Sequence, residues 1–131
     1  MEIPKDRKYA KTHEWVRVEG EVAYVGISDY AQEELGDIVY VEMPAPGDSY
    51  DKGEEAATVE SVKAASAIYA PLSGTVESIN PELEDTPEVI NQKPYEAHIF
   101  ALRFSDASAL DELLDAADYE KHVEQEKADH S

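Results

Sequence analysis

A single lysine stands out because of the residues around it. Lys63 lies in "TVESVKAASA", residues 58–67, among β-branched and small side chains, and Glu60 is the only carboxylate close to it in the sequence. This composition favours two strands, 55–62 and 65–70, joined by a tight turn with Lys63 at its tip. A lysine at such a tip is most often simply solvated. A rigid tip with a free four-carbon stem also suits the attachment of a cofactor arm.

A second group of polar side chains precedes the only tryptophan. The segment "THEW", residues 12–15, places a hydroxyl, an imidazole and a carboxylate next to one another. Taken by itself, it is interpreted as the start of a strand with an anchoring aromatic side chain. An enzyme that uses His13 and Glu14 is the alternative, and it predicts turnover by the unmodified protein.

The usual catalytic and metal-binding spacings are absent from the sequence. There is no Gly-rich phosphate loop, no HExxH, no GxSxG and no calcium-loop pattern. His98 precedes an expected strand and is interpreted as structural, whereas His122 and His130 are expected to be solvated in a helical tail. The sequence therefore predicts no catalytic residue and no metal site.

Charge and cysteine content narrow the classes of function. The 131-residue chain has 11 basic and 30 acidic side chains, a net charge of −19, which argues against nucleic acid or an anionic membrane as a partner. The acidic density exceeds what solubility needs and predicts adaptation to high salt, where screening removes self-repulsion. The absence of cysteine excludes disulfides and cysteine nucleophiles.

No targeting or membrane signal is recognised. The first fifteen residues lack the apolar region of a secretory signal, and no apolar run approaches the length that spans a membrane. We therefore expect a cytoplasmic protein.

The first half of the chain predicts strands and one short helix. Residues 14–18 and 21–27 read as a hairpin around Glu19-Gly20, and residues 28–35 as a helix that ends at Gly36. Ser28 or Asp29 can cap this helix. Residues 37–43 have apolar side chains in both alternating sets, so this strand is expected to be buried on both sides.

The second half predicts a long loop, one more strand and terminal helices. Residues 80–96 are acidic and contain prolines, and residues 98–104 form a core-facing strand. Helices are expected from about 107 to 126, with Ser108 capping the first and Asp115 the second. The chain is expected to form one domain over residues 1–131, with its core at about 7–126.

Three segments together resemble the H protein of the glycine cleavage system. They read "THEWVRVEG…VGISDYAQEELGD", "GDIVYVEMPAPGD" and "VESVKAASAIYAPLSGTV", in the family's order. The resemblance runs from about Arg7 to the second terminal helix. It implies a mainly β fold of the lipoyl-domain type, a flattened barrel or sandwich (hybrid barrel) with peripheral and C-terminal helices. It also implies lipoate in amide linkage to Lys63.

The function implied by this resemblance is carriage, without catalysis by the chain itself. The lipoyl group would take an aminomethyl group from a pyridoxal-phosphate glycine decarboxylase and deliver it to a tetrahydrofolate-dependent aminomethyltransferase. A dihydrolipoamide dehydrogenase would then reoxidise the dithiol. A lipoate-attaching enzyme would modify Lys63, and the carrier is expected to be a monomer. Glu60 precedes Lys63 by three residues on the same hairpin, close enough for that enzyme to recognise it, and a solvated strand carboxylate is the alternative interpretation.

The same resemblance points to a docking place for the loaded arm. In family members, the segment that matches "THEW" lines a cleft, which implies Glu14 for charge and Thr12 for hydrogen bonding. Many members have an acidic residue at the position of Ala67, and a Gly-Trp pair in place of Ala97-His98. Without an acidic residue at position 67, Glu14 should matter more here. The alternative is that Glu14 only solvates the start of the strand, and that the acidic loop from Pro81 to Pro94 covers the arm instead.

Two other carriers are weighed against this assignment. A biotin carrier would have methionines beside the modified lysine, but Val62 and Ala64 flank Lys63. A protein that only relays lipoate to other acceptors would keep the fold and the lysine, and the sequence leaves this role open.

Overall fold

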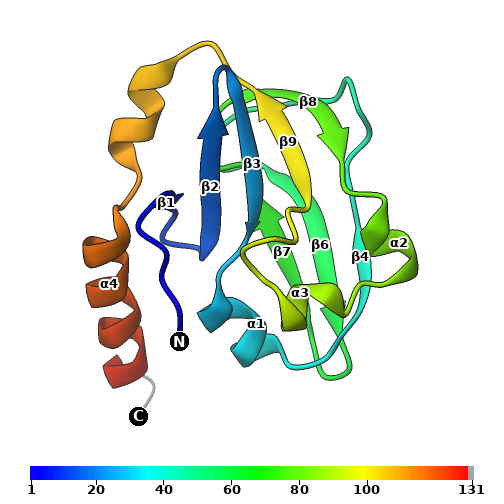
Figure 1. Ribbon diagram of the computed structural model, residues 1–131, viewed down its shortest axis with the longest axis vertical. Coiled ribbons are helices and arrows are strands. Elements are labelled where there is room, and N and C mark those ends of the chain that lie inside the picture. The colour runs from blue at the N-terminus through cyan, green and yellow to red at the C-terminus, as the bar shows by residue number, and fades with distance from the viewer. Residues whose placement is uncertain (130–131) are drawn as a thin grey trace.

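The computed structural model describes residues 1–129, whose strands form two sheets (Figure 1). The six-stranded sheet has the order β1-β2-β3-β9-β8-β5, and the three-stranded sheet the order β4-β6-β7. All the pairings are antiparallel. The strands are β1 (Lys8–Tyr9), β2 (Glu14–Glu19), β3 (Val22–Ile27), β4 (Ile38–Glu42), β5 (Ser49–Tyr50), β6 (Glu55–Ser61), β7 (Ala65–Tyr69), β8 (Gly74–Ile79) and β9 (Phe100–Arg103).

Short helices surround the sheets, and a longer one follows them at the C-terminal side. They are α1 (Asp29–Leu35), α2 (Glu82–Asp85), α3 (Val89–Gln92), a 3₁₀ helix (Ala107–Glu112) and α4 (Ala116–Asp129). The prediction of a mainly β fold with peripheral and C-terminal helices is confirmed. None of the helices within residues 1–129 is long and apolar enough to cross a membrane.

The main core brings apolar side chains of both sheets together. Val25 and Phe100 of the six-stranded sheet belong to the same buried cluster as Val59 and Ile68 of the three-stranded sheet. Burying side chains of this size stabilises each by about 1.5–3 kcal/mol relative to exposure. This shared core fixes the position of the β6–β7 hairpin relative to β2 and β3.

A second buried cluster lies where α4 packs beside β1 and β2. Tyr9 stacks on Tyr119 with ring centroids 4.5 Å apart, and Trp15 and Val123 belong to the same cluster. Tyr9 and Leu114 exchange two backbone hydrogen bonds of 2.8 Å, which hold the start of α4 against β1. Tyr119 and Val123, four residues apart on α4, are both fully buried and therefore lie on the same face of the helix.

Helix α1 begins and ends at the residues expected from the sequence. Ser28 caps α1, because its hydroxyl accepts a hydrogen bond from the N–H of Ala31 at 3.2 Å. Gly36 ends the helix with φ +81°, a conformation that glycine adopts without strain.

Three local expectations are wrong. Strand β4 is not buried on both sides, because Val39 and Tyr40 are each 52% exposed and a register shift lies between Ile38 and Tyr40. The first turn of the C-terminal region is a 3₁₀ helix capped by Asp106, which accepts the N–H of Ser108, so Ser108 is not the cap.

The third error is one of register at a turn. The β2–β3 turn lies at residues 20–21, one position later than expected, because Glu19 still pairs with Val22.

The long segment between β8 and β9 is folded rather than open. It contains α2 and α3, and its Leu83 and Ile90 reach into the main core. The carbonyl of Pro94 accepts a hydrogen bond from the indole N–H of Trp15 at 2.9 Å. The segment is therefore anchored at both helices and at its end.

Candidate functional site

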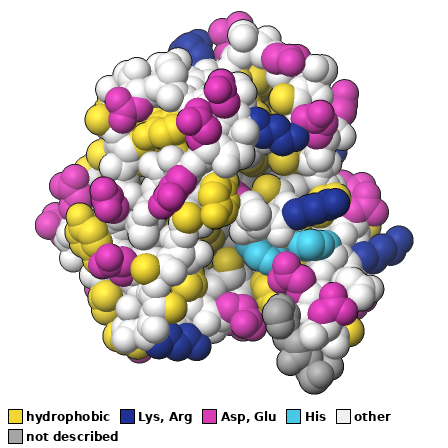
Figure 2. Space-filling model, turned by 180° about the vertical axis from the view of Figure 1, so that it is seen from behind, with side chains coloured by type: hydrophobic (Ala, Val, Ile, Leu, Met, Phe, Trp, Pro, Cys, Tyr) yellow, Lys and Arg dark blue, Asp and Glu magenta, His cyan; other side chains and the backbone are white. Residues whose placement is uncertain are grey.

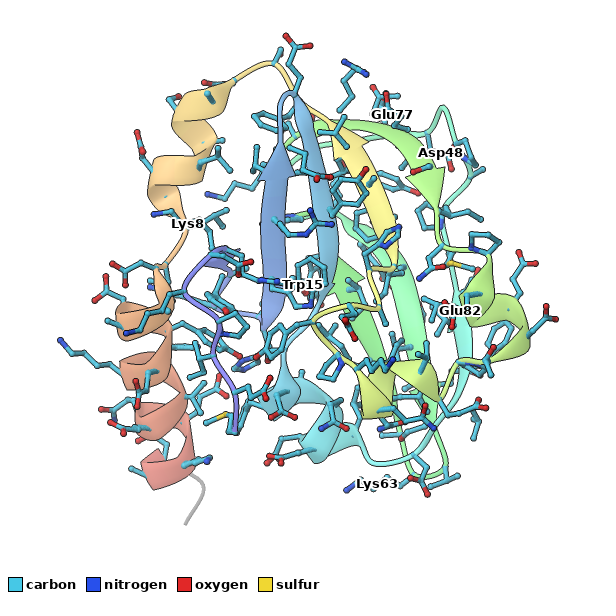
Figure 3. The ribbon with its side chains drawn as sticks, viewed as in Figure 1. Lys8, Trp15, Asp48, Lys63, Glu77 and Glu82 are labelled. Atoms are coloured by element: carbon cyan, nitrogen blue, oxygen red, sulfur yellow. The ribbon has the colours of Figure 1, made fainter. Side chains whose placement is uncertain are left out.

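Lys63 lies in the three-residue connection between β6 and β7, and Figure 3 shows it at the outer tip of this hairpin. The turn is held by Ser61, whose side-chain oxygen accepts the N–H groups of Lys63 and Ala64 at 3.3 and 3.1 Å. The N–H of Val62 donates to the carbonyl of Asp37 at 3.0 Å and ties the turn to the start of β4. The backbone at Lys63 is thus fixed while its side chain is exposed.

The stem of Lys63 rests against the C-terminal end of α1. A Cβ atom added at Gly36 would lie 3.5 Å from Cε of Lys63. Asn91 of α3 fixes this end of α1, because its amide donates to the carbonyl of Gly36 at 2.9 Å and accepts the N–H of Ile38 at 2.9 Å. Within residues 1–129 no ion pair engages the Lys63 ammonium group.

Glu60 lies on β6 with its side chain exposed. It pairs with Ala65 of β7 and Tyr40 of β4, so it belongs to the same hairpin as Lys63. Val62, the neighbour of Lys63 in the turn, is 71% exposed, and Tyr40 beside Glu60 is 52% exposed. The carboxylate is therefore accessible to a protein that approaches the hairpin.

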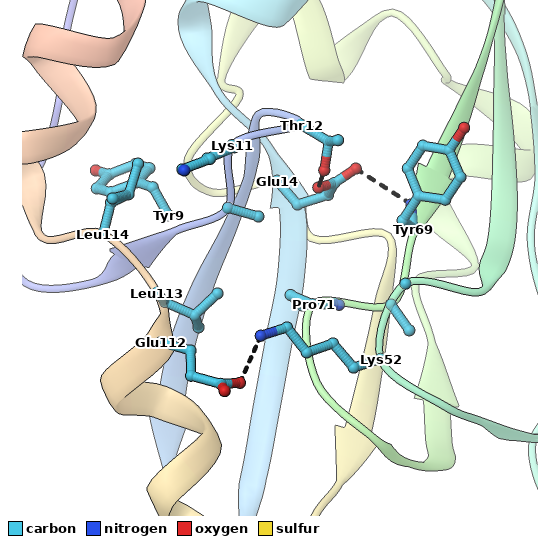
Figure 4. A pocket seen from close by; sticks show the side chains of 13 residues that line it. Tyr9, Lys11, Thr12, Glu14, Lys52, Tyr69, Pro71, Glu112, Leu113 and Leu114 are labelled. Carbon is cyan, nitrogen blue, oxygen red and sulfur yellow. Dashed lines mark hydrogen bonds and ion pairs between the residues drawn. The ribbon is translucent and has the colours of Figure 1, made fainter.

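Glu14 occupies a different place, at the start of β2, and is fully buried. One carboxylate oxygen accepts the hydroxyl of Thr12, and the other accepts the backbone N–H of Tyr69 at 3.1 Å (Figure 4). Glu14 therefore connects β2 of one sheet to β7 of the other. Burial raises the pKa of Glu14 from 4.5 to about 7, against the opposing effect of the hydrogen bonds from Thr12 and Tyr69.

A cavity of about 580 Å³ opens beside Glu14. Tyr9, Leu113, Leu114 and Pro71 give it apolar walls. Its other lining residues are Ala10, Lys11, Thr12, Lys52, Gly53, Tyr69, Ala70 and Glu112. Lys52 and Glu112 form an ion pair of 2.5 Å across one side, which Figure 4 shows. Two acidic residues, Glu14 and Glu112, line the cavity. Glu112 is paired with Lys52, whereas Glu14 forms no ion pair with a residue that the structure describes.

The structure brings Thr12 and Glu14 together, but it places Lys63 at the other end of β7. Tyr69 is six positions after Lys63, a span of roughly 20 Å along an extended strand. Ala67 lies half-buried between them, and neither Ala67 nor Lys63 lines the cavity. The candidate site therefore has two parts, an exposed lysine and a buried carboxylate, connected by one strand.

Ala97 and His98, which stand where many family members have Gly-Trp, are both packed against other residues. Ala97 is 3% exposed, and the ring of His98 packs edge-on against Tyr24 at 5.1 Å between centroids. Burial lowers the pKa of His98. These contacts agree with the structural role expected for His98.

Sequence reasoning missed the contacts that come from distant parts of the chain. The Tyr69 N–H, the Lys52–Glu112 pair and the Asn91 amide carry no local motif. His122 was expected to be solvated, yet it is half-buried and contacts the carbonyl of Lys11 at 2.9 Å. His130 lies outside the described residues.

The chain matches known proteins over nearly its whole length. The family model described as "Glycine cleavage H-protein" matches residues 7–126. A glycine cleavage system H protein of Syntrophomonas wolfei is 54% identical over 127 residues, 97% of this chain and 98% of the relative. One from Thermus thermophilus is 56% identical over 127 residues, 96% of this chain and 99% of the relative.

A solved structure agrees with the sequence relatives. The crystal structure of a glycine cleavage system H protein from Mycobacterium marinum superposes with a TM-score of 0.81 at 35% identity, covering 89% of this chain and 95% of the other. The chain therefore belongs to the glycine cleavage H-protein family.

Proposed function

We propose that this chain is the lipoate-carrying subunit of a glycine cleavage system, with lipoate in amide linkage to Lys63. The observation that carries this proposal is the position of Lys63 at the exposed tip of a hairpin whose backbone is fixed by Ser61 and Asp37. An enzyme that attaches lipoate can reach such a side chain without unfolding the chain. The family of the chain supports the identity of the group.

The residues around Lys63 fit an attached arm. Its stem lies against Gly36, where a long side chain would compete for the same space, and no ion pair with a described residue engages its amine. When bound, the lipoyl group supplies a dithiolane that can take up and release an aminomethyl group and cycle between disulfide and dithiol. The chain supplies the attachment point and the surfaces that orient the arm.

The proposed partners follow from this role. They are a pyridoxal-phosphate glycine decarboxylase, a tetrahydrofolate-dependent aminomethyltransferase, a dihydrolipoamide dehydrogenase and a lipoate-attaching enzyme. The carrier itself has no catalytic residue in this proposal and acts in the cytoplasm. Tethering keeps the cargo at high local concentration for each docked partner.

Glu14 and Thr12 are proposed to hold the cargo end of the arm. A lysine with lipoyl has a reach of roughly 12–14 Å from bond lengths, and the cargo with one hydrogen bond adds about 4–5 Å. The sum comes close to the roughly 20 Å between Lys63 and Tyr69, which is an upper bound because residues 63 and 64 belong to a turn. The arm must therefore lie nearly extended along β7, over the small side chain of Ala67.

The chemistry of the cavity suits a cationic amine. Burial holds the pKa of Glu14 at about 7, so the group is only partly ionised at neutral pH, and a cationic amine beside it would favour the carboxylate form. The attraction between the two opposite charges is stronger in this buried place than in water. Glu112, the other carboxylate of the lining, is already paired with Lys52. Glu14 has to provide the acidic contact alone, because Ala67 cannot. Exclusion of water from this cavity would protect the cargo from hydrolysis.

Attachment is tested by peptide mapping of the protein after growth with lipoate. A lipoyl amide is expected on Lys63 and on no other lysine, and Lys63→Arg is expected to abolish transfer while unfolding cooperatively. Lys8→Arg, at an exposed lysine on β1 that lies far from Lys63 in Figure 3, is the control. Lipoate on another lysine, or loss of the cooperative transition in Lys63→Arg, would contradict the proposal.

The role of Glu60 in recognition is tested by the rate of lipoylation. Glu60→Gln should be modified more slowly than the wild type, whereas Glu55→Gln, an exposed carboxylate at the far end of β6, should be modified at the wild-type rate. Equal rates for all three proteins would show that Glu60 is only a solvated strand residue.

The role of Glu14 is tested by the half-life of the aminomethyl-loaded protein. Glu14→Ala and Glu14→Gln should both lose their cargo faster than the wild type, and Thr12→Val should lose it at an intermediate rate. Glu60→Gln, exposed on β6, is the control for removal of a carboxylate. If all four variants keep the wild-type half-life, Glu14 does not hold the loaded arm, and the segment 81–94 becomes the candidate for covering it.

A further inference from the structure

Two histidines and a carboxylate meet where α4 packs against the turn before β2. One imidazole nitrogen of His13, one of His122 and one carboxylate oxygen of Glu126 lie within 4.8 Å of one another. We call these three residues the His13 cluster. Histidine side chains lie together on the face of the molecule shown in Figure 2, with basic and acidic side chains beside them.

The three side chains come from two elements, α4 and the turn before β2. His122 and Glu126 are four residues apart on α4, so they share one face of the helix. His13 reaches them from the turn before β2, with φ +78°, the only positive φ of a residue other than glycine among residues 1–129. A histidine in this conformation is strained, and strained residues concentrate at sites with a function.

We propose that the His13 cluster binds a divalent transition-metal ion, with zinc as the first candidate. Two imidazole nitrogens and one carboxylate oxygen are a donor set that zinc commonly uses, with a fourth position for water or a further ligand. Imidazole donors select zinc, copper or nickel over magnesium and calcium, which prefer oxygen.

The distances are close to those that a tetrahedral ion requires. Bonds of about 2.0–2.1 Å place neighbouring ligand atoms roughly 3.4 Å apart. Nε2 of His13 lies 2.8 Å from Oε2 of Glu126, and Nε2 of His122 lies 3.4 Å from Oε1. No two of the three ligand atoms are more than 4.8 Å apart, so shifts of roughly 1–1.5 Å would suffice. The side chains of His13, His122 and Glu126 are 15%, 25% and 32% exposed, so an ion can reach them.

A second layer of hydrogen bonds sets the correct nitrogen of His13 toward the ion. Nδ1 of His13 lies 2.8 Å from the hydroxyl of Tyr119, which lies 2.6 Å from the hydroxyl of Ser28. Without a metal ion, Nε2–H of His13 donates to Glu126 at 2.8 Å and Nδ1 accepts the hydroxyl of Tyr119. When Nε2 binds the ion it gives up this hydrogen, and Nδ1–H then donates to Tyr119, which donates to Ser28. Metal-binding histidines are oriented by partners of this kind.

His122 must exchange one contact to bind the ion. Its Nε2 now faces the carbonyl of Lys11 at 2.9 Å, so it carries a hydrogen there when that bond forms. Binding through Nε2 moves the hydrogen to Nδ1 and leaves the Lys11 carbonyl beside the ion. This carbonyl or a water molecule then completes four ligands.

Zinc titration of the untagged full-length chain tests the proposal. The titration uses Lys63→Arg protein, because a reduced lipoyl arm would itself bind zinc through sulfur. Excess magnesium and high salt occupy the many surface carboxylates. We expect one zinc ion per chain, a rise in the thermal unfolding midpoint with zinc concentration, and cobalt absorption in the visible range that reports a four-coordinate site.

Matched variants separate this cluster from other histidines and carboxylates. His122→Ala and Glu126→Gln should weaken zinc binding at least tenfold, and Tyr119→Phe by about tenfold through loss of orientation. His98→Gln, away from the cluster, and Glu124→Gln, exposed on α4, should bind like the parent protein. Circular dichroism confirms that each variant is folded before titration.

Two results would overturn the proposal. One is the absence of saturable zinc or cobalt binding in the parent protein. The other is equal binding by the cluster variants and the controls, which would assign the ions to scattered surface groups. The readout is metal binding, so it does not depend on lipoylation or on transfer activity.

Discussion

Replacing Glu14 by glutamine should change how the stability of the protein depends on pH. Glutamine has nearly the same shape, its carbonyl can accept the Tyr69 N–H, and its amide can donate to Thr12. The substitution therefore removes the titrating group while it keeps both hydrogen bonds. Any pH-dependent difference in stability then reports the ionisation of Glu14.

The magnitude follows from the pKa of Glu14, which burial raises from 4.5 to about 7. A raised carboxyl pKa means that the folded chain binds the proton more tightly than the unfolded chain. The resulting stabilisation is fully present below pH 4.5 and is lost as the pH rises through 7. At about 1.36 kcal/mol per pKa unit, most of it, about 2–3 kcal/mol, disappears between about pH 5 and pH 8.5.

The assay is denaturant unfolding of wild type and variant at both pH values, with EDTA present so that no metal occupies the His13 cluster. The free energy of unfolding of Glu14→Gln, relative to wild type, should rise by about 2–3 kcal/mol from about pH 5 to pH 8.5. Glu60→Gln controls for the loss of one carboxyl group. A difference that stays constant with pH, or that changes in the opposite direction, would refute the interpretation of Glu14 as a buried acid.

Three other perturbations test the packing and the charge of the chain. Gly26→Ala should destabilise by about 1–3 kcal/mol, measured by urea unfolding, because the new Cβ would lie 2.5 Å from the ring of Trp15; an unchanged midpoint would show that the ring can move. Asn91→Ala should cost about 1–3 kcal/mol, since it leaves the Ile38 N–H and the Gly36 carbonyl without this partner, whereas Asn91→Asp should cost less if the Ile38 bond dominates. The thermal midpoint should rise with potassium chloride into the molar range, because the net charge of −19 repels itself, and a flat profile would remove the inference of adaptation to high salt.

Local sequence signals predicted the elements whose ends they define. Ser28 and Gly36 mark the two ends of α1 because capping and positive φ depend on single residues. The β6–β7 hairpin was likewise predicted from strand-forming residues around a short connection. Lys63 appears at its tip for the same reason.

The error at β4 has a different origin. Apolar residues in both alternating sets indicate burial on both faces only if other elements cover both. The register shift between Ile38 and Tyr40 changes which side chains face the core, and Tyr40 remains exposed. The pattern of apolar residues shows neither the register shift in β4 nor that the face with Tyr40 is left uncovered by other elements.

In the candidate site, too, some features follow from local sequence and others from contacts between distant elements. Lys63 could be proposed from its motif, and Glu14 and Thr12 from the resemblance of their segment to a known family. The backbone N–H that Glu14 accepts in its buried position belongs to Tyr69, 55 residues away. The His13 cluster joins His13 to residues of α4 as far as 113 positions away, so the sequence gives no sign that its members lie together. Contacts of this kind are set by packing between elements and have no local pattern.

The turn before β2 connects the two proposed sites. The strain at His13 costs roughly 1–3 kcal/mol, and glycine would take this conformation without it. The strain is offset by contacts, because the backbone of His13 donates its N–H to Ala10 and accepts the N–H of Ser28, and its ring lies between Tyr119 and Glu126. The two ring contacts need the imidazole, and both lead to α4. Since Glu14 directly follows His13, α4 helps to set the backbone from which the buried carboxylate reaches the cavity.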